Sequence, residues 1–91
     1  MLRKTGVINH PDGLSARPAA LLVQVASRFS SHIMVEQDQK KINGKSIMGV
    51  LSLAIKKGSN VYLSIEGDDE EEAMNAILQL IDNNFTSIPN K

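Results

Sequence analysis

The chain of 91 residues contains no cysteine, no tryptophan, one tyrosine and two phenylalanines. The absence of cysteine excludes disulfide bonds, thiolate metal sites and thiol nucleophiles, and it is typical of a reducing compartment. No stretch approaches the roughly 20 apolar residues that span a bilayer, and the N-terminus lacks the apolar run of a signal peptide. We therefore expect a soluble, cytoplasmic protein with no membrane partner.

The sequence also lacks an excess of charge of either sign, because ten basic residues balance ten acidic ones. Residues 1–57 hold nine Lys or Arg against three Asp or Glu, whereas residues 58–91 hold one against seven, so the two parts carry +6 and −6. A dedicated nucleic-acid binder neutralises phosphates with a basic excess. The balance argues against direct nucleic-acid binding, although the basic part could dock an acidic partner.

Hydrophobic periodicity predicts four strands and three helices that alternate along one domain. The first strand covers about residues 3–9 and is stopped by a Pro-Asp-Gly turn. A hairpin follows near residues 32–43, and the clearest strand runs over residues 61–66. The helices are expected from Ser15 to about residue 26, from Ser46 to about residue 53, and over residues 68–84. The order is strand-helix-strand-strand-helix-strand-helix.

Each alternating strand has a single apolar face, which predicts a sheet covered by helices on one side and wet on the other. The apolar stripes expected on the first and last helices consist of Ala19, Leu22, Val23 and Ala26, and of Ala73, Ala76, Ile77 and Leu80. We expect a two-layer α+β fold, with residues 1–85 as a single domain and residues 86–91 as a loose tail.

Motifs for metal binding or independent catalysis are missing. His10 and His32 have no second ligand at a convincing spacing, so both are interpreted as surface histidines. The acidic run at residues 68–72 is best explained as the start of a helix, with Asp68 and Glu71 at the spacing of a capping box. No Gly-rich phosphate loop is present. We expect no metal, no cofactor and no enzyme active site.

Two serines, Ser15 and Ser46, each precede a predicted helix. A helix N-terminus offers unpaired N–H groups and a positive potential, and it can therefore receive a phosphate. On its own, each serine is more simply explained as a helix cap than as a phosphorylation site.

The stretches Gly-Leu-Ser-Ala-Arg-Pro-Ala-Ala at residues 13–20 and Lys-Ser-Ile-Met-Gly-Val-Leu-Ser-Leu at residues 45–53 resemble the HPr family of the bacterial sugar phosphotransferase system. Together with Glu66-Gly67 and the acidic helix start, the resemblance covers nearly all of residues 1–85. It implies an HPr-like open-faced β-sandwich, a four-stranded antiparallel sheet with three helices on one face.

One position departs from the family pattern, because Ser15 stands where phosphocarriers have their phosphate-accepting histidine. A neutral imidazole is nucleophilic near physiological pH and forms a labile phosphoryl adduct. A serine hydroxyl needs an activating base and yields an unreactive ester. The chain is similar in this respect to the Crh branch of the family, which keeps the regulatory serine but lacks the histidine, although Crh has glutamine at this position.

The leading hypothesis is a regulatory protein that is phosphorylated at Ser46 by HPr kinase/phosphorylase. The resemblance implies that the modified protein binds a LacI-type catabolite control repressor as corepressor. The residues implied to contact partners are Arg17, Ala20, Ile47, Met48 and Leu51. At least one of Ile47 and Leu51 is expected to be buried in the core.

Two alternatives remain open. The chain could be a phosphocarrier whose active-site histidine was replaced by serine, in which case its partners would be enzyme I and the sugar-specific components of the transport system. It could also be a degenerate paralogue that docks to the same partners and competes without responding to phosphorylation.

Overall fold

The computed structural model describes residues 1–86 and residue 88. Its elements follow the predicted order. They are β1 (Leu2–Ile8), α1 (Ala16–Ala26), β2 (His32–Gln37), β3 (Lys40–Asn43), α2 (Ile47–Ser52), β4 (Ser59–Glu66) and α3 (Glu70–Asp82). None of the helices among these residues is long and apolar enough to cross a bilayer.

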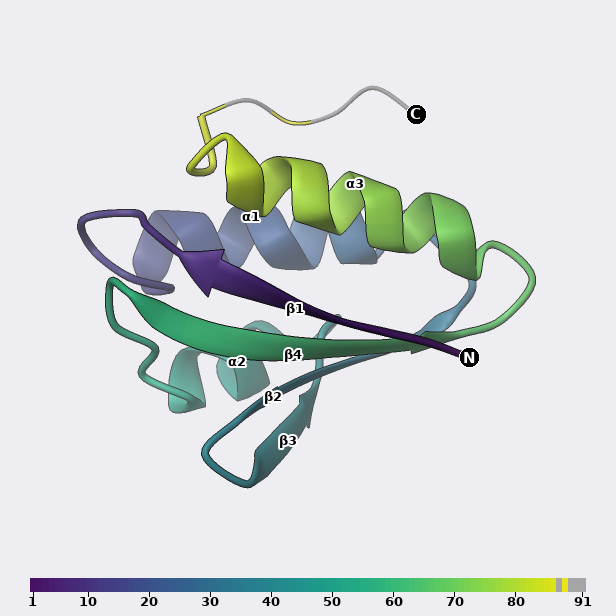
Figure 1. The fold of residues 1–91 in the computed structure, drawn as a ribbon, viewed down its shortest axis with the longest axis horizontal. Coiled ribbons are helices and arrows are strands. Elements are labelled where there is room, and N and C mark those ends of the chain that lie inside the picture. Colours follow the sequence, from purple (N-terminus) through teal and green to yellow (C-terminus); the bar gives the residue numbers. More distant parts are fainter. Residues whose placement is uncertain (87, 89–91) are drawn as a thin grey trace.

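The four strands form one antiparallel sheet in the order β1-β4-β2-β3. Figure 1 shows α1 and α3 lying together over one side of this sheet. The short helix α2 contacts α1 and β3. The two-layer α+β architecture predicted from the alternation of apolar residues is therefore confirmed.

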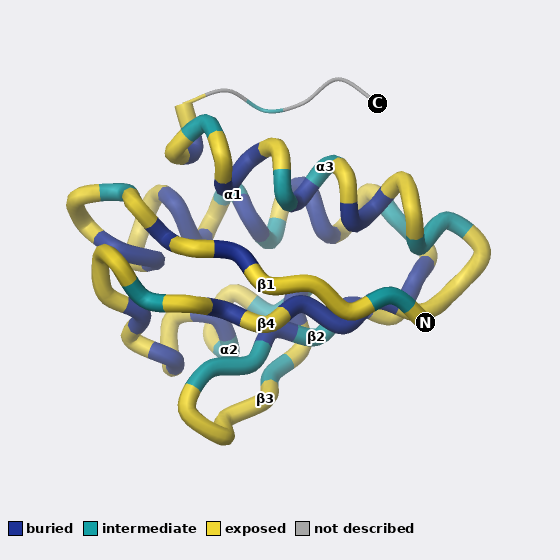
Figure 2. The backbone as a smooth tube through the Cα atoms, in the orientation of Figure 1, coloured by how far each residue is buried: buried dark blue, intermediate teal, exposed yellow. Residues whose placement is uncertain are grey.

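The core lies between the sheet and the helices, because alternate side chains of each strand point to the same face. The buried apolar positions of β2 and β4 are Ile33, Val35, Val61, Leu63 and Ile65. Figure 2 shows the buried segments of the strands and helices facing one another across the interior. The first and last helices contribute Ala19, Leu22, Val25, Ala26, Ala73, Met74, Ile77, Leu80 and Ile81.

The helix stripes predicted from the sequence are partly wrong. Val25 is fully buried in α1, whereas Val23 is only partly buried. In α3, Met74 is buried and Ala76 is only partly so. Helix α1 contacts both α2 and α3, whereas α3 contacts α1 and the strands β1 and β4. Because each helix contacts more than one neighbouring element, a wider part of its surface is buried than the single stripe that the spacing of apolar residues predicts.

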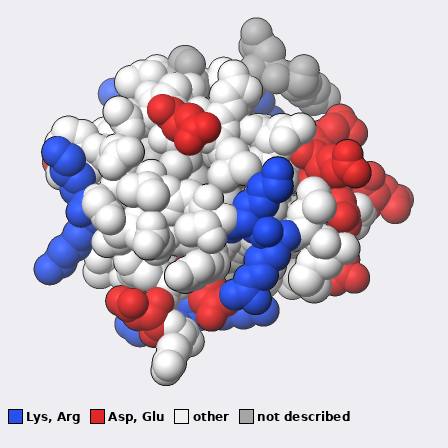
Figure 3. Space-filling view, viewed as in Figure 1, with Lys and Arg blue, Asp and Glu red and all other residues white. Residues whose placement is uncertain are grey.

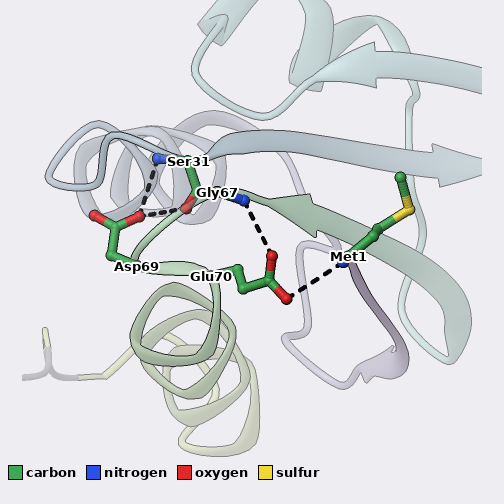
Figure 4. A network of polar contacts seen from close by, with 5 residues as sticks. All are labelled: Met1, Ser31, Gly67, Asp69 and Glu70. Atoms are coloured by element: carbon green, nitrogen blue, oxygen red, sulfur yellow. Dashed lines mark hydrogen bonds and ion pairs between the residues drawn. The ribbon is translucent and has the colours of Figure 1, made fainter.

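Helix α3 begins one residue later than a capping box at Asp68 and Glu71 would require. The N-cap is Asp69, and its side chain makes no capping bond. Its carboxylate instead accepts the backbone N–H of Ser30 at 2.9 Å and the hydroxyl of Ser30. It also accepts the backbone N–H of Ser31 at 3.0 Å and the hydroxyl of Ser31 (Figure 4). The predicted capping box is therefore wrong, because long-range partners take the cap carboxylate.

A second carboxylate ties the same region to the N-terminus of the chain. Glu70 accepts the backbone N–H of Gly67 at 3.1 Å and lies 3.4 Å from the Met1 ammonium group. The hydrogen bond from Ser31 does most to hold the pKa of Asp69 below its ordinary value, and the bond from Gly67 does most to lower the pKa of Glu70. Figure 3 shows acidic side chains gathered at this end of the molecule, where α3 begins.

The chain reverses direction after α3. Asn84 and Phe85 both have positive φ angles, 57° and 61°, which turn Phe85 back into the core. The backbone N–H of Thr86 donates to the side chain of Asn83 at 3.1 Å, and Ile88 packs against the core. The remainder of the tail predicted to be loose, residues 87 and 89–91, lies outside the described residues.

Candidate functional site

Ser15 lies in the loop that joins β1 to α1, immediately before the helix. Its side chain is exposed, and its Oγ donates a hydrogen bond to the carbonyl oxygen of Asp12 at 2.8 Å. It occupies the N-cap position of α1 but accepts no N–H of the first turn. The predicted side-chain cap is therefore wrong. Ala16, at a φ of 35°, departs from the regular helical backbone on which a side-chain cap depends.

The loop before Ser15 is held from both sides. The N–H of Asp12 donates to Nδ1 of His10 at 3.1 Å, and the N–H of Leu14 donates to the carbonyl of Ile55 at 2.9 Å. An Nδ1 that accepts a hydrogen bond has its lone pair engaged, and a neutral ring then carries its proton on Nε2. His10 thus helps to hold the loop, with its Nδ1 engaged as the acceptor of this hydrogen bond.

His10 is half-buried rather than a freely exposed histidine, because its ring meets that of Phe85 edge to face at 6.2 Å between centroids. Together with Arg17 it borders a shallow pocket of about 320 Å³, lined by His10, Arg17, Pro18, Asn84, Phe85 and Thr86. Arg17 is exposed, and among the described residues its guanidinium has no ion-pair partner. The structure thus brings Arg17 beside the end of α3.

Ser46 occupies the N-cap position of α2 and does act as a side-chain cap. Its Oγ accepts the N–H of Gly49 at 3.1 Å, and its own N–H donates to the carbonyl of Asn43 at 3.0 Å. The preceding Lys45 is anchored by its ammonium group, which donates to the carbonyl of Phe29 at 2.6 Å. The half-buried Ser46 is therefore held in one orientation at the start of the helix.

Helix α2 is seated mainly by one buried side chain, Val50. Ile47 and Leu51 are each 38% exposed and Met48 is 75% exposed. The expectation that Ile47 or Leu51 belongs to the core is therefore wrong. A helix of six residues has fewer than two turns and offers the core a single position, which leaves its other apolar side chains outside.

We call the exposed side chains of Ile47, Met48 and Leu51 the α2 surface. Met48 and Leu51 are three residues apart, and Ile47 and Leu51 are four apart, so that both pairs are neighbours on the helix. Ser46 immediately precedes them. Ala20 is exposed on α1, which contacts α2. The residues expected from the resemblance thus fall into two regions, Ser46 with the α2 surface and Ser15 with Arg17.

The two serine loops, the order of strands and the pattern of helices can be compared with known proteins. The family model described as "PTS HPr component phosphorylation site" matches residues 2–83. The chain belongs to the HPr family. This family comprises phosphocarrier proteins rather than enzymes.

Relatives of this HPr-family chain carry two different names. It is 52% identical over 82 residues to HPr-like protein Crh of Halalkalibacterium halodurans, covering 90% of this chain and 98% of the relative. It is 48% identical over 85 residues to phosphocarrier protein HPr of Treponema pallidum, covering 93% and 97%. The Crh names support an HPr-like regulatory function related to the phosphotransferase system.

The fold also matches solved HPr structures. The crystal structure of HPr-C-His from Thermoanaerobacter tengcongensis superposes with a TM-score of 0.93 at 55% identity, covering 96% of this chain and 98% of the other. The open-faced sandwich that the resemblance implied is therefore confirmed.

Sequence reasoning missed the residues that hold the loop of Ser15. His10 was dismissed as a surface histidine because no partner lies near it in sequence, and its contact with Phe85 spans most of the chain. The Pro-Asp-Gly run after His10 was the one available signal, since a tight turn directs nearby backbone N–H groups toward a side chain that can accept them.

Proposed function

We propose that this HPr-family chain is a regulatory protein, phosphorylated at Ser46 by HPr kinase/phosphorylase, and that the phosphorylated form binds a LacI-type catabolite control repressor as corepressor. The observation that carries the proposal is the position of Ser46, a fixed hydroxyl directly beside three exposed apolar side chains. Once Ser46 is phosphorylated, the charge of the phosphate lies next to the exposed apolar side chains of the α2 surface.

Phosphorylation of Ser46 would add about −1.5 to −2 charges and three acceptor oxygens. Asp and Glu are absent from the first turn of α2, so no carboxylate of that turn repels the phosphate. The helix N-terminus favours negative charge, and the modification therefore suits the fold. Basic side chains of a partner would gain charge-assisted hydrogen bonds that the unmodified serine does not offer.

The α2 surface would supply the apolar contact area for that partner. Ile47 and Leu51 are exposed to the same extent, and Met48 is the most exposed of the three. The flexible thioether of methionine adapts to partners of different shape. Ala20 and Arg17 on α1 would extend the contact, with the guanidinium of Arg17 available to a partner's carboxylates.

The residues around position 15 argue against a phosphoryl relay in this chain. Ser15 donates its proton to a backbone carbonyl rather than to a base, and no described carboxylate or imidazole accepts that proton. Because a serine nucleophile requires such a base, Ser15 lacks the activation that group transfer demands.

The test is labelling with purified HPr kinase/phosphorylase and ATP, comparing the wild type with Ser46→Ala and Ser52→Ala. Ser52 is the matched control, because it is an exposed serine on the same helix, with its hydroxyl bonded to the carbonyl of Gly49 at 2.6 Å. The proposal predicts full labelling of wild type and Ser52→Ala and none of Ser46→Ala. Equal labelling of both variants would contradict it.

Thermal melting of each variant is the control for correct folding in the labelling assay. Ser46→Ala removes a side-chain cap and costs about 0.5–2 kcal/mol of stability. A cooperative melt of the variant well above the assay temperature shows that loss of labelling reflects loss of the hydroxyl and not unfolding.

A second candidate, a phosphocarrier of the sugar phosphotransferase system, is favoured by the likeness to the Treponema pallidum phosphocarrier and by the intact Arg17-Pro18 that follows position 15. It predicts that Ser15→His gains phosphoenolpyruvate-dependent labelling through enzyme I. A folded Ser15→His variant that stays unlabelled would rule this candidate out.

A further inference from the structure

The four methionines of the chain differ sharply in exposure. Met48 is 75% exposed and Met1 is 73% exposed, whereas Met34 is partly buried and Met74 is 1% exposed. Met74 lies on the buried side of α3, in the core. Of the three methionines that follow the N-terminal residue, Met48 is therefore the most exposed, and small oxidants reach its side chain without any opening of the fold.

Met48 is also the most exposed residue of the α2 surface, next to Ser46. Oxidation to the sulfoxide converts a flexible apolar side chain into a polar one and is reversed by methionine sulfoxide reductases. In the core such a change disrupts packing. At Met48 it leaves Val50, the residue that seats α2, untouched.

We propose that Met48 is a reversible oxidation site, which peroxides convert to the sulfoxide, and that this conversion blocks docking on the α2 surface. This proposal rests on the proposed function, because it assigns a second modification to the same partner surface.

The chemistry balances with hydrogen peroxide as the oxidant. The sulfur lone pair attacks one peroxide oxygen, the O–O bond breaks and an S–O bond forms. The thioether loses two electrons, and the remaining oxygen leaves as water after a proton shift within the peroxide. No further reductant or metal is required for this step.

The consequence for a partner follows from desolvation. An apolar pocket that receives the Met48 thioether offers no donor to a sulfoxide oxygen, and an unpaired polar group in an interface is costly. Ser46 keeps its hydrogen bond to Gly49, because neither residue's bond involves the Met48 side chain. Oxidation would therefore weaken docking by about tenfold or more while the Ser46 site stays intact.

The first arm of the test is independent of any partner. The native full-length protein is treated with hydrogen peroxide, and sulfoxides are mapped by peptide mass spectrometry over time. The expected order is Met48 and Met1 first, Met34 later and Met74 last. A Met48 that oxidises no faster than Met74 would overturn the proposal.

The second arm measures the consequence for HPr kinase/phosphorylase. The rate of Ser46 labelling is compared before and after peroxide treatment, in the wild type and in Met48→Leu, a volume-conserving change that cannot be oxidised. We expect about a tenfold loss in the oxidised wild type, recovery after methionine sulfoxide reductases, and no loss in Met48→Leu. Met34→Leu is the matched control and should remain as sensitive as the wild type.

The two arms separate failure of this proposal from failure of the proposed function. Equal labelling of oxidised and reduced wild type would overturn the oxidation switch while leaving Ser46 as the kinase site. Absence of labelling in the reduced wild type would instead refute the proposed function. It would also refute the oxidation switch, because that switch depends on the proposed function.

Discussion

Gly13 fixes the loop that carries Ser15, and its replacement by alanine should be strongly destabilising. Its φ is 65°, in the left-handed region, which costs about 1–2 kcal/mol for a residue with a Cβ. A Cβ at this position would lie 2.1 Å from the carbonyl oxygen of Ile55 and 3.0 Å from Cα of Lys56. Both neighbours are backbone atoms, so the loop itself must move.

Movement of the loop removes specific interactions. The hydrogen bond from Leu14 to Ile55, 2.9 Å long, is worth about 1 kcal/mol. Leu14 is only 1% exposed, and drawing part of this side chain out of the core costs about 1–2 kcal/mol more. Added to the φ penalty, the loss for Gly13→Ala is about 3–5 kcal/mol of unfolding free energy.

The assay is equilibrium urea denaturation, with Gly58→Ala as the matched control. Gly58 has a φ of 87°, but a Cβ there would meet nothing within 4 Å. Gly58→Ala therefore reports the conformational penalty alone, about 1–2 kcal/mol. If Gly13→Ala loses no more stability than Gly58→Ala, the close approach of Gly13 to Ile55 does not constrain the loop.

Two further predictions concern the core and the acid dependence of stability. Leu63→Ala removes a fully buried side chain from β4 and should cost about 2–5 kcal/mol, measured by the same denaturation, and a loss below about 1 kcal/mol would contradict its place in the core. The pKa of Asp69 is lowered in the folded state, so its contribution is present above the ordinary carboxyl range near pH 4 and is lost as the pH falls through the folded pKa. Asp69→Asn should lower stability at pH 7 and flatten the decline of stability on acidification, whereas an unchanged acid dependence would show that the serine contacts do not matter.

The strands and helices could be predicted because their signals are local. Val61, Leu63 and Ile65 alternate with polar residues, and all three are buried as expected. The stop after β1 follows from the turn residues Pro11-Asp12-Gly13. The family resemblance added the antiparallel sheet, which periodicity alone does not specify.

The predicted helix caps were wrong where a side chain expected to cap a helix forms hydrogen bonds with other residues instead. Asp69 was expected to lie inside a helix start, but Ser30 and Ser31, nearly 40 positions earlier, hold its carboxylate. Ser15 has the spacing of a side-chain cap, yet its hydroxyl bonds Asp12 instead. Such choices depend on the three-dimensional arrangement of the loops, which no sequence period encodes.

The family resemblance implied partner contacts at the α2 surface, but the apolar spacing did not predict that both Ile47 and Leu51 are exposed. Ile47 and Leu51 are apolar at helical spacing, a pattern that favours burial. They remain outside because α2 is short and is seated through Val50. An apolar pattern in a helix of fewer than two turns therefore gives no prediction of which side faces the core.

We propose that phosphate on Ser46 turns the α2 surface into a docking site for a LacI-type repressor. The most direct measurement is a calorimetric titration of that repressor with the Ser46-phosphorylated chain and with the unmodified chain. We expect binding at least about tenfold tighter for the phosphorylated chain, since the phosphate adds charge-assisted hydrogen bonds. Equal affinity for the two forms would contradict it.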